Sequence, residues 1–169
     1  MVSNARIRGR INRDNGKEFE SIILAACDRY RAEGIADIDK TPEPMSVVQN
    51  LGKGKFVAYF AKKAQPDFQG TLAGSGRSIC FEAKHTSSDR IEKSAVSSEQ
   101  EKVLDIKYKM GAECFVLVSF QFMRYYKVPW EIWKDMKNQF GHQYMSETDG
   151  APYLLKHSAG PYIKFLCES

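Results

Sequence analysis

Apolar residues that recur every three or four positions predict three helices in this chain. The first covers residues 15–31, with Asp14 or Asn15 as its cap and Gly34 as its end. The second covers about residues 98–110, and the third begins at Pro129, a residue that suits the first turn of a helix. The apolar face of the first helix contains Phe19, Ile22, Ile23, Ala26 and Tyr30.

Shorter apolar runs between these helices predict strands. Three cover about residues 35–39, 66–72 and 77–84, and AGSG (73–76) joins the last two as a hairpin. ECFVLVSF (113–120) is apolar on both faces, which is typical of a central buried strand, with MRYYKV (123–128) as its neighbour. YIKFLC (162–167) is a further short strand candidate. This order indicates an α/β domain with a mixed β-sheet flanked by helices.

Two basic segments, residues 1–14 and 45–64, do not fit the pattern of a compact core. Residues 45–64 are rich in Lys and Gly around the alternating run KFVAYFA, and they predict a hairpin-like protrusion from a single domain over residues 15–169. Residues 1–14 predict a basic, flexible N-terminal arm. Contact with DNA phosphates is one interpretation of both segments, and a solvated basic surface is the other. The cations concerned are Arg6, Arg8, Arg10, Arg13, Lys53, Lys55, Lys62 and Lys63.

Composition narrows the class of protein. The chain has 169 residues with 43% hydrophobic content and a net charge of +4, enough apolar mass for one compact core. No apolar run reaches the roughly 18 residues of a membrane span, and no apolar segment follows the N-terminal charges. We therefore expect a soluble, cytoplasmic protein. The cysteines lack any CxxC pair and are expected to be reduced core thiols; they are Cys27, Cys80, Cys114 and Cys167.

Candidate chemistry gathers at the end of the strand over residues 77–84. A period of two places Glu82 and Lys84 on the same face as Cys80, opposite the apolar face. If AGSG is a four-residue loop, Asp67 stands across the hairpin from Glu82. Opposed carboxylates about 5 Å apart repel each other unless a cation lies between them, and Mg²⁺ prefers such oxygen-rich sites. Solvated residues on an edge strand are the alternative interpretation.

The motifs around this hairpin resemble a known nuclease pattern. Pro66-Asp67 followed by Glu82-Ala83-Lys84 is similar to the PD-(D/E)xK signature. The order of NRDNGKEFE, DKTPEP, PDFQG, FEAKHT, a helix-opening Gln and GAECFVLVSF resembles the RecU-type Holliday-junction resolvases of bacteria and their phages, over residues 12–135.

This resemblance implies a restriction-endonuclease-like core with a protruding stalk at residues 45–64. It also implies a homodimer that nicks four-way DNA junctions symmetrically with Mg²⁺, for which Mn²⁺ can substitute. The implied metal ligands are Asp67, Glu82 and the carbonyl of Ala83, with Lys84 as the catalytic lysine. Glu20 would approach the metal through water, and Gln100 would support the site.

Several interpretations stay open. Gln100 also fits a capping box with Ser97, and Glu20 suits the first turn of a helix. Family members often have an acid at the position of Cys80 and a threonine at that of Pro66. The loss of one acid puts a second metal in doubt, and the cysteine in its place modestly favours Mn²⁺. The alternatives to junction cleavage are a non-catalytic junction-binding recombination protein and a nuclease acting on other DNA structures.

Overall fold

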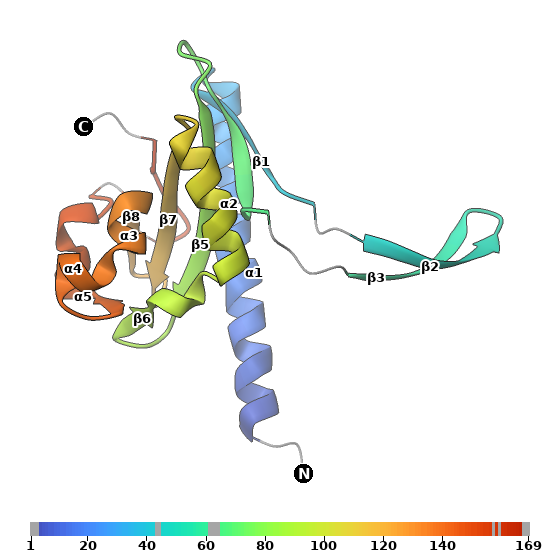
Figure 1. The fold of residues 1–169 in the computed structure, drawn as a ribbon, viewed down its shortest axis with the longest axis horizontal. Helices are drawn as coiled ribbons and strands as arrows, with labels where there is room; N and C mark the ends of the chain where they lie inside the picture. The colour runs from blue at the N-terminus through green and yellow to red at the C-terminus, as the bar shows by residue number, and fades with distance from the viewer. Residues whose placement is uncertain (1–3, 43–44, 61–64, 157, 159, 167–169) are drawn as a thin grey trace.

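The core of the protein is a five-stranded mixed sheet (Figure 1). A computed structural model describes residues 4–42, 45–60, 65–156, 158 and 160–166. The strand order is β1-β4-β5-β7-β8, in which β5 and β7 are parallel and the other neighbours are antiparallel. These strands are β1 (Ala36–Lys40), β4 (Phe68–Leu72), β5 (Ser78–Thr86), β7 (Glu113–Phe120) and β8 (Arg124–Pro129). The predicted mixed sheet with a central antiparallel hairpin is confirmed.

Helices cover both faces of this sheet. The long helix α1 (Asn4–Ala32) lies behind it in Figure 1, and α2 (Ser98–Lys109) lies in front. The smaller elements after β8 are α3 (Trp130–Lys134), α4 (Met136–Phe140), α5 (Glu147–Gly150) and the 3₁₀ turn η2 (Ala151–Tyr153). Between β5 and α2 lie β6 (Arg90–Glu92), which pairs with β9 (Tyr144–Ser146), and the turn η1 (Lys93–Ala95).

The alternation along β5 separates two apolar cores. Ile79 and Phe81 pack with the buried face of α1, whereas Cys80 packs with α2, β7 and the tryptophans of α3. The side chain of Glu82 is fully buried on the same side as Cys80. The predicted division of this strand into an apolar face and a face with chemical groups is therefore confirmed.

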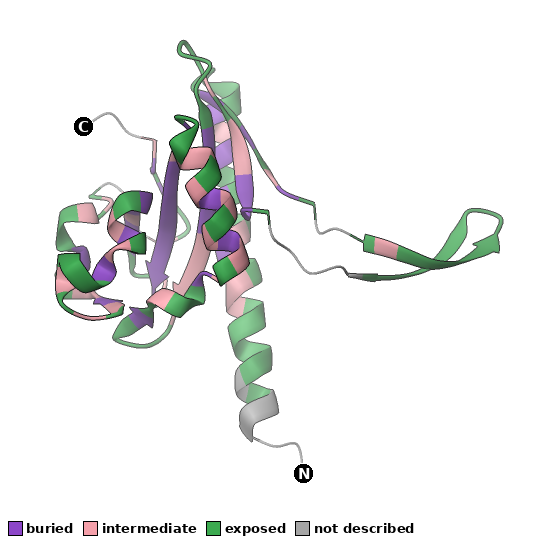
Figure 2. Cartoon of the chain, viewed as in Figure 1, coloured by how far each residue is buried: buried purple, intermediate pink, exposed green. Residues whose placement is uncertain are grey.

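The hairpin formed by β2 (Met45–Gly52) and β3 (Lys55–Phe60) projects away from the edge of the sheet that β1 forms. It is exposed along nearly its whole length (Figure 2). Its exposed side chains include several large apolar ones: Met45, Val47, Val48, Leu51, Phe56, Val57 and Tyr59. A two-stranded ribbon of this kind has little independent stability in water.

Two predictions from the sequence are wrong: the start of the first helix and the C-terminal strand. The first helix begins at Asn4 and not near Asn15, because residues 4–14 contain good helix formers and Arg10 lies 3.9 Å from Asp14 one turn later. The described side chains of this part are exposed (Figure 2), so they show no pattern of burial. A separate arm over residues 1–14 stays a prediction.

The second error concerns the C-terminal segment. Residues 162–166 form no strand, although Ile163 and Phe165 are buried in the core beside α1. The backbone N–H of Phe165 donates to the hydroxyl of Tyr30 at 2.8 Å, and Arg29 donates to the carbonyl of Ile163. Side chains of α1 thus replace the hydrogen bonds that a neighbouring strand would make.

Among the described helices, none is long and apolar enough to cross a membrane.

Candidate active site

Asp67 and Glu82 converge at the open end of the β4–β5 hairpin. Asp67 directly precedes β4, and the pairing of Phe68 with Phe81 continues the register to place it across from Glu82. The backbone N–H of Ala83 donates to Asp67 Oδ2 at 3.1 Å. Asp67 is only 7% exposed and Glu82 is 0% exposed. The expected facing pair of carboxylates is therefore present, and it is buried.

Lys84 and Gln100 both contact the same oxygen of Glu82. Lys84 Nζ lies 2.9 Å from Glu82 Oε2 and 3.7 Å from Asp67 Oδ2. Gln100 Nε2 donates to Glu82 Oε2 at 2.7 Å. An ammonium and an amide from different elements therefore hold one carboxylate in a fixed orientation.

Gln100 caps α2 and also contacts Glu82, while its role in catalysis stays a prediction. Its backbone N–H donates to the hydroxyl of Ser97, and its side-chain Oε1 accepts from the N–H of Ser97 at 3.0 Å, which completes the capping box. The other end of the amide reaches Glu82. Capping α2 thus also aims the Gln100 side chain at the carboxylate.

Burial raises the pKa of Glu82 to about 8, with Lys84 opposing the shift and Asp67 adding to it. The second oxygen, Oε1, is buried and has no hydrogen-bond partner. A buried carboxylate oxygen without a partner is costly, so the fold favours a cation or a proton at this atom. This arrangement is typical of a functional group and unusual for a structural one.

The residues present fit a divalent cation. In the described part of the chain no three His, Cys, Asp or Glu side chains gather as a metal-binding group. Asp67 and Glu82 nevertheless offer two carboxylates, and the unpartnered Glu82 oxygen supplies a free ligand atom. Oxygen donors of this kind, completed by backbone carbonyl and water, suit Mg²⁺ or Mn²⁺.

Glu20 does not join this pair. Its carboxylate lies 2.5 Å from Lys40 Nζ at the end of β1. In this structure the charge of Glu20 is balanced by Lys40. The role expected for Glu20 near the metal stays a prediction.

Two neighbours of the site were not expected from the sequence. Thr41 donates its backbone N–H to the carbonyl of Asp67 at 2.8 Å, and its own hydroxyl is buried without a partner. His85 lies within hydrogen-bond distance of Ser119 and stacks on Phe122, and burial lowers its pKa. Nothing in the sequence pairs Thr41 with Asp67 or His85 with Ser119, because these partners are far apart along the chain.

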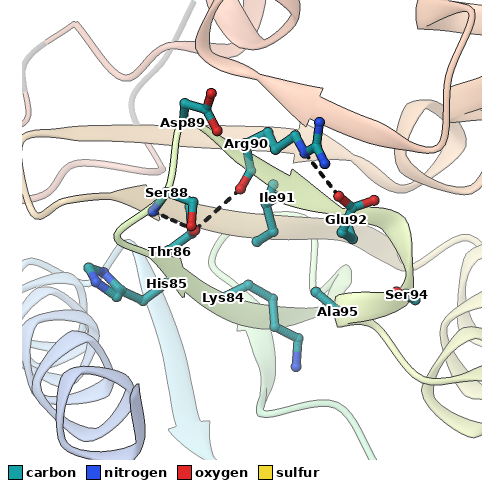
Figure 3. A pocket seen from close by; sticks show the side chains of 10 residues that line it. All are labelled: Lys84, His85, Thr86, Ser88, Asp89, Arg90, Ile91, Glu92, Ser94 and Ala95. Atoms are coloured by element: carbon teal, nitrogen blue, oxygen red, sulfur yellow. Dashed lines mark hydrogen bonds and ion pairs between the residues drawn. The ribbon is translucent and has the colours of Figure 1, made fainter. Parts of the chain in front are cut away.

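A cavity of about 600 Å³ opens beside Lys84, between β5 and β6 (Figure 3). Thr86 donates to the carbonyl of Arg90, and the Arg90 guanidinium pairs with Glu92 at 3.1 Å. Lys84 therefore lies between the buried carboxylates and a space open to solvent.

The structure describes only some of the cations expected to contact DNA. Arg10 and Arg13 are exposed on α1, and Lys53 and Lys55 are exposed at the tip of the hairpin. The side chains of Arg6 and Arg8 lie outside the described part, as do Lys62 and Lys63 entirely. The two described pairs, Arg10 with Arg13 and Lys53 with Lys55, thus lie on separate elements, α1 and the β2–β3 hairpin (Figure 1).

Comparison with known proteins agrees with this geometry. The family described as recombination protein U (RecU) matches residues 14–167, which is most of the chain. The chain belongs to the RecU family. Two relatives called Holliday junction resolvase RecU, from Streptococcus pneumoniae strains Hungary19A-6 and CGSP14, are each 32% identical over 113 residues. These alignments cover 63% of this RecU-family chain and 56% of each relative, so the chain spans about half the length of the curated relatives it matches.

A solved structure supports the fold of this RecU-family chain. Hjc of Archaeoglobus fulgidus, a Holliday junction resolvase, matches with a TM-score of 0.52 and 14% sequence identity. The match covers 82% of this chain and 94% of that one. The restriction-endonuclease-like core expected from the motifs is confirmed at the level of the fold.

Proposed function

We propose that this protein is a metal-dependent endodeoxyribonuclease that resolves four-way DNA junctions by paired nicks, in recombination and repair in the cytoplasm. The observation that carries the proposal is the convergence of Asp67, Glu82 and Lys84 at one buried point beside an open cavity. Membership of the RecU family supports the choice of substrate, because the matched relatives are called Holliday junction resolvases.

In this proposal Asp67, Glu82 and the Ala83 carbonyl hold Mg²⁺, or Mn²⁺ in its place. The ion, when bound, supplies Lewis-acid stabilisation of the negative charge on the phosphate. Lys84 Nζ orients the attacking water and stabilises the negative charge on a phosphate oxygen. Gln100 keeps Glu82 oriented. Attack in line with the leaving 3′ oxygen gives a 5′ phosphate end.

The proposed DNA contacts are made by cations on two exposed surfaces. Arg10 and Arg13 on α1 and Lys53 and Lys55 on the hairpin are exposed cations that would neutralise phosphates. The proposed roles of Arg6, Arg8, Lys62 and Lys63 rest on the sequence alone. Selection of a junction would then come from its shape.

A homodimer is part of the same proposal. The exposed apolar side chains of the β2–β3 hairpin support it, because an isolated ribbon with this composition would gain stability by packing on a second copy. Two active sites in one assembly would also explain paired nicks.

One incubation tests the function. A four-way junction labelled on each strand, mixed with the protein and Mg²⁺, should be nicked at symmetric positions, and a linear duplex of the same sequence should be cut much more slowly. The control omits Mg²⁺ and adds a chelator. Binding of the junction without any Mg²⁺-dependent nick would favour a non-catalytic junction-binding protein. Equal cutting of duplex and junction would favour a nuclease with a broader choice of DNA.

Replacing Gln100 by alanine should lower Mn²⁺ affinity and the nicking rate by roughly 10–100-fold, the usual cost of losing an outer-shell partner. The reason is that Glu82 loses its 2.7 Å donor while both carboxylates remain. Calorimetric titration with Mn²⁺ and the junction assay measure the two effects. The matched control is Ser97→Ala, which removes the hydroxyl that caps the same helix but keeps the Gln100 side chain. Equal losses in the two variants would assign Gln100 to capping alone.

A further inference from the structure

Cys80 and Cys114 form a pair of touching thiols in the core. They are register partners on the parallel strands β5 and β7, and their sulfur atoms are 3.2 Å apart. Their exposed fractions are 0% and 5%. Neighbouring strands lie about 4.8 Å apart, which is within the Cα separation that a disulfide spans. Only a small further approach of the two sulfurs separates this pair from a covalent bond.

We propose that Cys80 and Cys114 are an oxidation site, at which hydrogen peroxide joins the two thiols in a disulfide between β5 and β7. In the first step the Cys114 sulfur attacks a peroxide oxygen, the O–O bond breaks, and a sulfenic acid and one water form. In the second step the Cys80 sulfur attacks the Cys114 sulfur, the S–O bond breaks, and the oxygen leaves as a second water. Two thiols are oxidised and one peroxide is reduced to two waters.

The surroundings decide which sulfur meets the oxidant. Cys114 lines a cavity of about 340 Å³ together with Arg77, Tyr108 and Lys127, whereas Cys80 is enclosed. A small peroxide can therefore reach Cys114, and the enclosed Cys80 then attacks the oxidised Cys114 sulfur. The contact with Cys80 and burial raise the pKa of the Cys114 thiol, so the reactive thiolate is scarce and the reaction needs long exposure to the oxidant.

Cys27 provides an internal comparison. It is a free, buried thiol in the other core, on α1, and burial raises its pKa to about 12. Burial is thus shared by Cys27 and Cys80, and the thiol neighbour is what distinguishes the pair. Oxidation that depends on this neighbour should leave Cys27 reduced.

The pair also lies close to the candidate active site. Cys80 precedes Glu82 by two residues on the same face of β5. A disulfide is about 2.05 Å long, so the sulfurs must approach by about 1 Å. Catalytic groups tolerate displacements of about 0.5 Å, and a 1 Å shift can cost roughly 100-fold in rate. We therefore expect oxidation to stop nicking and reduction by dithiothreitol to restore it. This expectation rests on the proposed function.

Peptide mapping tests the site independently of activity. The full chain is treated with hydrogen peroxide, blocked with N-ethylmaleimide and digested with trypsin. We expect a linked pair of SICFEAK and MGAECFVLVSFQFMR, which hold one cysteine each, while EFESIILAACDR carries Cys27 as the maleimide adduct. Recovery of both peptides as separate adducts, or of Cys114 as sulfinic acid beside unmodified Cys80, would overturn the site.

Two variants separate the modification from its effect. In Cys114→Ser the peroxide should no longer inhibit nicking, and in Cys27→Ser inhibition and its reversal should match the unmodified chain. Inhibition that persists in Cys114→Ser would overturn the switch but not the mapped disulfide. A reduced protein that never nicks with Mg²⁺ would instead count against the proposed function, while the peptide map still decides the site.

Discussion

Replacing Asp67 by alanine should abolish Mg²⁺-dependent nicking of a four-way junction while the variant still binds the junction. Asp67 and Glu82 are the two carboxylates at the site within the described part of the chain, so the loss of Asp67 should exceed the roughly 10–100-fold cost of removing an outer-shell partner. The proposed phosphate contacts lie on α1 and the β2–β3 hairpin, which are separate elements from the β4–β5 hairpin that holds the site. Single-turnover nicking measures the first effect, and a gel-shift titration in a chelator measures the second.

A second substitution at Asp67 tests whether the loss of nicking comes from the lost charge or from a disturbed fold. Asp67 Oδ2 accepts the N–H of Ala83, so alanine also removes a hydrogen bond within the hairpin. Asp67→Asn keeps an oxygen acceptor and the shape but removes the charge, and it should be equally inactive with a melting temperature close to that of the unmodified chain. Nicking at the unmodified rate by either variant would refute the assignment of Asp67.

The register of one hairpin made the centre of the site predictable from the sequence. A period of two and a four-residue glycine loop determine which side chains face each other, so Asp67 and Glu82 could be paired without a structure. Lys84 follows from the same alternation. These are local rules, acting over fewer than twenty residues.

Contacts between elements that are distant in the sequence could not be predicted from such local rules. Ser97 and Gln100 predicted a helix cap, but only the packing of α2 on the sheet brings the Gln100 amide to Glu82. Pairing of Glu20 with Lys40 depends on how α1 crosses β1. The thiol contact of Cys80 and Cys114 depends on the parallel pairing of β5 and β7, which a helix separates in the sequence. Tertiary packing, and not the pattern along the chain, determines all three.

Exposure explains one of the other misses, and backbone hydrogen bonding explains the second. The described side chains in the first turns of α1 are exposed, so no buried apolar face marked these turns as helical. In the C-terminal segment the apolar alternation was real, since Ile163 and Phe165 are buried, but Tyr30 and Arg29 satisfy the backbone there. A pattern of burial thus predicts which side chains enter the core, while the hydrogen-bond partners decide whether a strand forms.

The buried Glu82 carboxyl should make the metal-free protein less stable as the pH rises. Burial raises its pKa from 4.5 to about 8 in the folded state, whereas an unfolded chain returns it to the ordinary value. Between these two values the folded state binds more protons than the unfolded state, so the free energy of unfolding falls with increasing pH. The slope can reach about 1.4 kcal/mol per pH unit for one group. The contribution is complete below pH 4.5 and lost above about pH 8.

Comparison with Glu82→Gln isolates this effect, because glutamine keeps the shape and cannot ionise. Urea unfolding at pH 5, 6, 7 and 8 in a chelator should show the unmodified chain losing stability relative to the variant at each step. Other acids, such as Asp105 with its lowered pKa, contribute equally to both proteins and cancel. Mg²⁺ added at pH 8 should restore the unmodified chain alone, since binding at the deprotonated carboxylate replaces the proton. Parallel curves for the two proteins would show that Glu82 ionises freely and would remove the electrostatic reason for a cation at this site.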